Sequence, residues 1–190
     1  MHDDEVAFTA YVHARRDAVR RAAYLLCGDW YWADDLTQSV FIRLATHWKR
    51  IRDQEALHGW VRVSLLRAYL SENRRVWRRR EQQVVALPEP AGTRDAADEA
   101  GLQLMFENAL RRLSPRQRAT VLCRYYHGLD VAQTAAALRC SPGTVKSQTA
   151  RALSTLRELL APQLVDEWAA EGDGSKVATI AYQPNSEVIP

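Results

Sequence analysis

The sequence predicts an all-α protein of two small helical domains joined by a flexible linker, the second with a helix-turn-helix. Apolar residues recur at three- and four-residue spacing from about Glu5 to Gln83 and again from about Ala97 to Leu160. A segment rich in proline and glycine separates these blocks, and two short helical patterns lie close together in the second one. Strand-like alternation is missing before the C-terminal tail, so we expect no sheet in either block.

These patterns divide the chain of 190 residues into four parts. We expect a first domain, an acidic Pro/Gly linker, a second domain and an acidic C-terminal extension, at residues 1–83, 84–97, 98–162 and 163–190. The linker contains Pro88, Pro90 and Gly92 and has no helical period. The extension holds five acidic side chains and one lysine and so has a net charge of −4. Since the whole chain has a net charge of +3, residues 1–162 have a net charge of +7. A basic body of this kind attracts polyanions.

In the first domain, "WADDLTQSVFIRLATHW" (Trp32–Trp48) predicts an amphipathic helix. The expected core positions are Ala33, Leu36, Val40, Leu44 and Trp48, with Phe41 at their edge. The opposite face carries Asp35, Gln38, Ile42 and Ala45, which make a polar surface with an apolar patch. One exposed isoleucine means little by itself, so this surface is either an ordinary solvated face or a protein-docking face.

A polar loop from Lys49 to Gly59 is expected to lead into a basic helix that starts near Trp60. The expected inner positions of this helix are Trp60, Val63, Leu66 or Arg67, and Leu70, and its other face runs through Arg62, Arg67, Ser71, Arg74 and Arg75. Five arginines and Trp77 follow in "RRVWRRR", residues 74–80. A loop above such a helix can hold unstacked bases while the cations bind phosphates. The alternative is a solvated helix end with the tryptophan in the core.

In the second domain, "LDVAQTAAALRCSPGTVKSQTARAL" (Leu129–Leu153) predicts a helix-turn-helix. Asp130 is placed to cap the first helix with Gln133 closing a capping box, and Ser141 with Pro142 starts the second helix about three residues after the first ends. The turn position that glycine usually fills holds Arg139, where a left-handed backbone would carry strain.

The second helix of this motif has an apolar side and a free side. Val145, Ala152, Leu156 and Leu160 are expected to pack, and the opposite side holds Gly143, Lys146, Ser147, Ala150, Arg151 and Ser154. Small residues with two cations allow close approach to a groove, with Lys146 on phosphate and Arg151 on guanine. The alternative is an amphipathic helix with a solvated polar face.

Other features of the sequence argue against a membrane protein and against an enzyme. No apolar run approaches the roughly 20 residues of a membrane span, and "MHDDEVAFTA" does not have the pattern of a signal peptide, so we expect a cytoplasmic protein without membrane contact. Three widely spaced cysteines, Cys27, Cys123 and Cys140, argue against a disulfide framework. The histidines lack metal-ligand spacing and a nucleophile partner, and a glycine-rich phosphate loop is missing. We expect no catalytic residue, no metal and no cofactor.

The order of these segments carries a family resemblance. "ADDLTQSVF", "WVRVSLLRAYLSENRR", a proline-containing linker and "LRRLSPRQRATVLCRYYHGLDVAQTAAALRCSPGTVKSQTARALSTLREL" resemble the extracytoplasmic-function class of bacterial RNA polymerase sigma factors, and most of all its actinobacterial SigE-like group. The resemblance covers about residues 5 to 160 and is more specific in the second domain. Ser39 stands where related sequences commonly carry an acid, and Arg67 stands where they commonly carry an asparagine.

This resemblance implies an alternative sigma factor, which binds core RNA polymerase and directs promoter recognition, DNA melting and transcription initiation. It implies docking on the polymerase, at the clamp helices of its largest subunit and at its flap, with Asp35, Gln38, Ser39 and Ile42 as the core-binding residues. The minus-ten element, as unpaired non-template strand, would be held by Lys49, Arg50, Arg52, Trp60, Arg62, Arg67, Arg74 and Arg75. The minus-thirty-five element, as duplex, would be read by Thr144, Lys146, Ser147 and Arg151. An anti-sigma factor is a further partner that the resemblance leaves open.

Two alternatives stay open at this point. A stand-alone helix-turn-helix regulator would usually dimerise on a palindrome and would use its first domain for an effector or a dimer contact, which the basic helix and the linker fit poorly. Residues 163–190 are either a disordered acidic extension or a regulatory tail, which would compete with DNA for the basic residues at 74–80 or 146–151.

Overall fold

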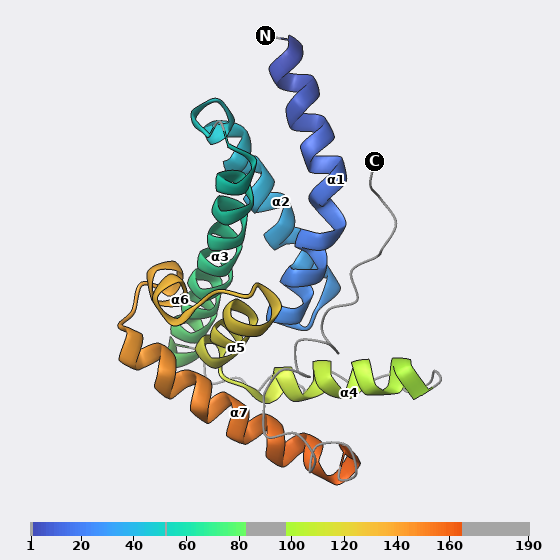
Figure 1. Cartoon of the computed structure of the whole chain (residues 1–190), viewed down its shortest axis with the longest axis vertical. Coiled ribbons are helices and arrows are strands. Elements are labelled where there is room, and N and C mark those ends of the chain that lie inside the picture. Colours follow the sequence, from blue (N-terminus) through green and yellow to red (C-terminus); the bar gives the residue numbers. More distant parts are fainter. Residues whose placement is uncertain (1, 52, 83–97, 165–190) are drawn as a thin grey trace. The chain divides into compact units, whose positions relative to one another are not determined.

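The computed structural model describes residues 2–51, 53–82 and 98–164, and helices are the regular secondary structure of this part of the chain (Figure 1). The chain divides into two units, Met1–Pro88 and Glu89–Pro190. The predicted all-α class with two helical domains is therefore confirmed. The linker at 84–97 lies outside the described residues, and so does the acidic extension apart from residues 163 and 164.

The described residues of the first unit form three α-helices: α1 (His2–Cys27), α2 (Trp30–His47) and α3 (Gln54–Gln82), with a 3-10 turn, η1 (Trp48–Arg50), after α2. A tight connection reverses the chain between α1 and α2. Gly28 ends α1 with φ 72°, and its N–H donates to the Tyr24 carbonyl at 2.6 Å. The Asp29 carboxylate then accepts from the Trp32 N–H at 2.8 Å and caps α2. The two helices therefore pack side by side, and α3 packs against both (Figure 1).

The core of this unit confirms most of the predicted inner face of α2. Ala33, Leu36, Val40, Phe41 and Leu44 are buried, together with Leu26 of α1 and Leu66 and Tyr69 of α3. Trp48 is only half-buried, because it lies beyond the end of α2 and packs its ring against Phe8 and Tyr11, at centroid distances of 5.2 and 5.6 Å.

The predicted loop from Lys49 to Gly59 is wrong. The basic helix α3 begins at Gln54, six residues before Trp60, because Asp53 caps it: its carboxylate accepts from the Ala56 N–H at 3.2 Å and its carbonyl from the Leu57 N–H at 3.0 Å. Lys49 lies in η1, and Gly59 lies within the helix. The connection between α2 and α3 is thus much shorter than the composition suggested.

Leu66 is buried as predicted, but the other positions predicted for the inner face of α3 are wrong. The buried positions are Leu57, Val61, Leu65, Leu66, Ala68 and Tyr69. Trp60, Val63 and Leu70 are half-buried, and Arg67 is exposed. The error came from Trp60, whose ring contacts the His47 ring at 5.3 Å on the flank of the core instead of pointing into it.

The second unit contains α4 (Asp98–Arg112), α5 (Pro115–Val121), a π-helical turn, η2 (Leu122–Tyr126), α6 (Val131–Leu138) and α7 (Pro142–Leu164). Ser114 and Gln117 form a capping box at the start of α5, with Pro115 as its first residue. Helix α7 packs against α4, α5 and α6. The predicted apolar side of α7 is confirmed, since Val145, Ala152, Leu156 and Leu160 are all buried.

A buried arginine fastens α5 to the end of α4. The Arg118 side chain is 7% exposed. Its Nε donates to the Leu110 carbonyl at 2.7 Å, and its Nη2 donates to the carbonyls of Arg111 and Leu113 at 2.7 and 3.3 Å. The guanidinium thus donates to carbonyls at the C-terminal end of α4 and just beyond it, where helical donors run out.

Within the described helices, none is both long and apolar enough to cross a membrane. The three cysteines are free thiols, with Cys123 buried and the other two half-buried.

Candidate protein- and nucleic-acid-binding surfaces

The outer side of α2 presents the residues that were predicted to dock a protein. We call Asp35, Gln38, Ser39 and Ile42 the α2 face. Asp35 and Gln38 are exposed, Ser39 is half-buried on the flank, and Ile42 is 61% exposed. An isoleucine with that much free surface contributes little to the core, so its removal should not affect the fold.

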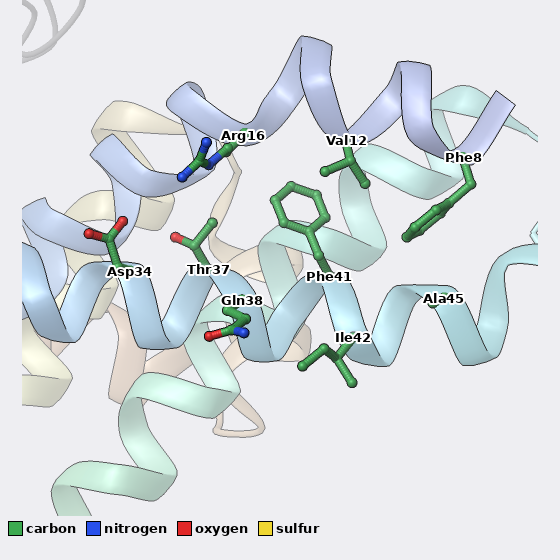
Figure 2. A pocket seen from close by; sticks show the side chains of 9 residues that line it. All are labelled: Phe8, Val12, Arg16, Asp34, Thr37, Gln38, Phe41, Ile42 and Ala45. Carbon is green, nitrogen blue, oxygen red and sulfur yellow. The ribbon is translucent and has the colours of Figure 1, made fainter. Parts of the chain in front are cut away.

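A groove of about 570 Å³ runs beside the α2 face, between α1 and α2 (Figure 2). Its apolar lining comes from Phe8 and Val12 of α1 and from Phe41, Ile42 and Ala45 of α2. Its polar end is lined by Arg16, Asp34, Thr37 and Gln38. Gln38 and Ile42 therefore belong to both the α2 face and the rim of the groove. The sequence analysis missed the groove because it depends on how α1 lies against α2.

An ion pair and an aromatic stack hold the polar end of the groove. Arg20 donates from Nε and Nη2 to the two carboxylate oxygens of Asp34, at 2.5 and 3.0 Å. This hydrogen bonding lowers the pKa of Asp34 below its ordinary value. The same guanidinium lies 4.4 Å from the ring centroid of Trp30, which stacks on Tyr24 at 4.0 Å. The end of α1 is thus fixed against the start of α2.

Tyr31 is a surface residue that the sequence analysis missed. It is 87% exposed. Tyr31, Asp35, Gln38 and Ile42 follow one another at spacings of four, three and four residues. Residues at this spacing lie along one stripe of a helix. The available signal was this spacing, which went unused because the predicted helix began at Trp32 and so left Tyr31 outside it. The stripe therefore has a large apolar side chain at each end and polar side chains between.

The basic residues predicted to bind the minus-ten element do not all share one surface. Arg67, Arg74 and Arg75 are exposed on α3, and Lys49 and Arg50 are exposed on η1. Trp60 and Arg62 are half-buried, and Arg52 lies outside the described residues. Arg62 is five residues from Arg67, which places it about 140° away around the helix axis. The prediction that Arg62 shares the face of Arg67 is therefore wrong.

A hollow of about 950 Å³ adjoins Lys49, between α1, η1 and the start of α3. Three rings line it, those of Tyr11, Trp48 and His58, and the first stacks on the last at 5.8 Å. Arg15 adds a second cation. Burial raises the pKa of Tyr11, although Arg15 opposes the shift, so the phenol stays protonated at neutral pH. The sequence analysis placed base capture in the loop alone and did not find the residues that α1 contributes.

The helix-turn-helix has the predicted caps. The Asp130 carboxylate accepts from the Gln133 N–H at 2.7 Å, and the Gln133 side chain accepts from the Asp130 N–H at 2.9 Å. Ser141 accepts from the Thr144 N–H at 3.1 Å, and three residues separate α6 from α7. Arg139 in the turn is left-handed, with φ 53° and ψ 55°. The predicted motif is confirmed together with the strained turn position.

The residues of α7 that were predicted to contact DNA differ in their exposure and in their hydrogen bonds. Lys146, Ser147 and Arg151 are exposed at the start of the helix, whereas Thr144 is half-buried and its hydroxyl lies 2.9 Å from that of Ser141. The Ser147 hydroxyl donates to the Thr144 carbonyl at 3.0 Å. The two cations therefore present long side chains to a ligand, while Thr144 also serves the helix cap.

Comparisons with known proteins identify the class to which these two units belong. Sigma-70 region 2 matches residues 11–79, and Sigma-70, region 4 matches residues 103–156. The RNA polymerase sigma-E factor of Streptomyces avermitilis is 33% identical, over 90% of this chain and 94% of its own. The sigma-E factor of Streptomyces coelicolor is 34% identical, over 86% of this chain and 92% of its own. This chain belongs to the sigma-70 family of RNA polymerase sigma factors, within the extracytoplasmic-function group.

The chain is accordingly a sigma factor that directs promoter recognition and transcription initiation, and it is not an enzyme. Sigma factors act by binding core RNA polymerase and promoter DNA. A solved structure supports the fold: the sigma factor RpoE in complex with the anti-sigma factor NepR from Bartonella quintana has a TM-score of 0.67 and 24% identity, over 83% of this chain and 98% of that one.

Proposed function

We propose that this sigma factor docks on core polymerase through the α2 face and reads the promoter with two separate DNA-binding surfaces. Residues 1–83 would carry the docking and minus-ten functions, and residues 98–162 the minus-thirty-five function. The observation that carries the proposal is the exposed Ile42 on a polar stripe beside an apolar groove. An exposed apolar surface of this kind does not stabilise the free chain, and such surfaces mark binding sites.

The geometry of the α2 face, together with Tyr31 on the same side of the helix, suits a helical partner. From Tyr31 to Ile42 the stripe spans eleven residues, or roughly 17 Å of helix. Large apolar side chains at both ends act as anchors, and the polar residues between them set the register. The clamp helices of the largest polymerase subunit are the partner that the family implies for this face, and the flap is the partner implied for the second unit.

The minus-ten element would be bound as unpaired non-template strand. Aromatic rings can stack on a base, and cations beside them can bind the flanking phosphates. The hollow at Lys49 offers both, with Tyr11 and His58 on its wall and Arg15 at its edge. Arg67, Arg74 and Arg75 would follow the backbone along α3. Because this surface binds unpaired bases better than duplex, binding shifts the population toward melted DNA.

The minus-thirty-five element would be read as duplex by the start of α7. The N-terminal residues of a recognition helix enter the major groove first. Arg151 would make a bidentate guanine contact and Lys146 a phosphate contact, and Thr144 and Ser147 lie one turn apart near the start of the same helix. The small residues between the cations let the helix approach closely.

An anti-sigma factor is the further partner that we propose, and the complex of RpoE with NepR supports this choice. A protein that covers the α2 face would compete with polymerase for the same anchors. A factor that works with bacterial polymerase on genomic DNA acts in the cytoplasm.

The test is a substitution at the exposed isoleucine. Ile42→Arg should abolish binding of the full chain to purified core polymerase and leave its melting temperature nearly unchanged. Val6→Arg is the matched control, because Val6 is also exposed but lies outside both the groove and the α2 face. Normal core binding by the Ile42→Arg variant would refute the docking proposal. Promoter binding without polymerase would favour a stand-alone regulator.

A further inference from the structure

Arg139 stands at a backbone position that glycine would occupy with less strain. Among residues 2–51, 53–82 and 98–164, it alone has a positive φ without being glycine. At the two other described positions of this kind, φ 72° and φ 64°, the chain uses Gly28 and Gly128. In the left-handed region the Cβ atom of an L-residue crowds the backbone, so an arginine here costs stability that glycine would not.

The hydrogen bonds of the turn force this conformation on whatever residue occupies it. The Cys140 N–H donates to the Ala135 carbonyl at 3.0 Å, and the Arg139 N–H donates to the Ala136 carbonyl at 3.4 Å. This pair of bonds is a Schellman motif, in which the left-handed residue is the first one after the helix cap. The backbone requirement is therefore fixed, and it gives no reason for a long cationic side chain.

The charge around the turn points to an anionic ligand. Between Val131 and Leu156 the sequence contains three basic residues, Arg139, Lys146 and Arg151, and no acidic residue. Arg139 is exposed. A cation near the end of α6 also interacts favourably with the helix dipole, but any position in the last turn would serve that purpose without a strained backbone.

We propose that Arg139 donates to a backbone phosphate of the minus-thirty-five duplex, at the edge of the groove that α7 enters. This inference rests on the proposed function, because it takes the exposed side of α7 as the DNA-reading side. The turn from Arg139 to Ser141 directly precedes the N-terminus of α7, so it passes the sugar-phosphate backbone when that end of the helix enters the groove. A guanidinium suits phosphate in geometry and charge.

A phosphate contact of this kind sets affinity and register but carries no base preference. The left-handed Arg139 would then lower the stability of the second unit and raise its affinity for DNA. This pair of effects separates the proposal from a merely structural role, because one substitution should move the two properties in opposite directions.

The experiment compares three substitutions in the full chain. Arg139→Gly removes both the cation and the strain, Arg139→Gln removes the cation and keeps the strain, and Arg139→Lys keeps the charge. Melting temperatures are measured on the free chain. Binding of the holoenzyme, assembled from core polymerase and each variant, is measured on promoter DNA from 50 to 200 mM salt.

Arg139→Gly should raise the melting temperature by roughly 2–6 °C and still weaken DNA binding. Arg139→Gln should weaken binding to the same extent without the gain in stability. Loss of one phosphate contact makes the slope of log K against log salt shallower by about 0.9, so the loss of affinity should be about 3.5-fold larger at 50 mM than at 200 mM. Arg139→Lys should stay within about twofold of the unchanged protein.

Arg157→Gln is the matched control, since it removes one exposed cation of the same helix-turn-helix region from a position beyond the predicted readers. It should leave the salt slope unchanged. If Arg139→Gln binds with the same slope as the unchanged protein, the phosphate contact does not exist. If Arg151→Ala also leaves duplex binding unchanged, the proposed reading side of α7 is wrong; if Arg151→Ala weakens binding and Arg139→Gln does not, only the contact from the turn is wrong.

Discussion

Arg20 binds both carboxylate oxygens of Asp34, at 2.5 and 3.0 Å, and so ties α1 to α2 at the polar end of the groove. Both side chains keep a third or more of their surface in solvent. The contact therefore contributes to the alignment of the two helices more than to the free energy of folding. That alignment places Gln38 and Ile42 on the rim of the groove (Figure 2).

The ion pair predicts a dependence of stability on pH. Hydrogen bonding by Arg20 lowers the pKa of Asp34 in the folded chain below its ordinary value of 3.8. The stabilisation is therefore fully present well above the ordinary pKa of 3.8 and is lost as the pH falls through the lower folded pKa. Asp34→Asn should melt below the unchanged protein at pH 7, and the difference should narrow as the pH falls below 3.8. A difference that stays constant over this range would show that the carboxylate charge is not its source.

A second prediction concerns the buried arginine of the second unit. Arg118→Met keeps an unbranched chain but removes the guanidinium donor from the carbonyls of Arg111 and Leu113, whereas the Leu110 carbonyl still accepts from the Leu113 N–H. At about 1–3 kcal/mol for each of these two carbonyls, the second unit should lose roughly 2–6 kcal/mol of stability. Arg116→Met alters an exposed arginine of the same helix and serves as the control. Equal melting temperatures for the two variants in thermal denaturation would contradict the role of the guanidinium.

A third prediction separates the two DNA-binding surfaces. Arg151→Ala should weaken recognition of the upstream duplex by about 1–3 kcal/mol and leave binding to a pre-melted downstream template nearly unchanged. Arg74→Ala should have the reverse effect, because Arg74 lies on the surface proposed for the unpaired strand. The measurement is binding of holoenzyme to fork templates that carry one element or the other. Similar losses on both templates would reject the division of labour.

The amino-acid pattern predicted the fold class and the helix-turn-helix because each rests on local signals. Caps at Asp130 and Ser141 and the apolar spacing of α7 depend only on residues close in sequence. The start of α3 was missed since the Asp53 cap has no capping-box partner to mark it, and Trp60 was read as core although it packs on the flank. Gly59 inside the helix also resembled a loop residue.

The surfaces that we propose for binding were predictable where a single helix forms them. Asp35, Gln38 and Ile42 follow from the periodicity of α2, and their exposure confirms the predicted outward side. The groove and the hollow at Lys49 were not predictable, because both need side chains of α1 placed against other helices. Periodicity also failed for Arg62, whose angular position had been assigned from a wrong inner face.

The acidic extension gives a fourth prediction. Helix α7 continues to Leu164, so a truncation should follow that residue. If the net charge of the extension competes with DNA for basic surfaces, removal of residues 165–190 should strengthen promoter binding at low salt, and the gain should fade as screening shortens to roughly 8 Å at physiological ionic strength. Binding that is unchanged at both salt concentrations would exclude this competition. Weaker transcription after truncation would indicate a contact with polymerase instead.

The central claim is that this chain reads promoters only together with core polymerase. The most direct test is transcription from a genomic promoter library by purified core polymerase, alone, with the full chain, and with its Ile42→Arg variant. We expect specific start sites to appear with the full chain, and neither core alone nor core with the variant to produce them. Sequence-specific promoter binding by the chain without polymerase, or start sites that persist with a folded Ile42→Arg variant, would contradict the account.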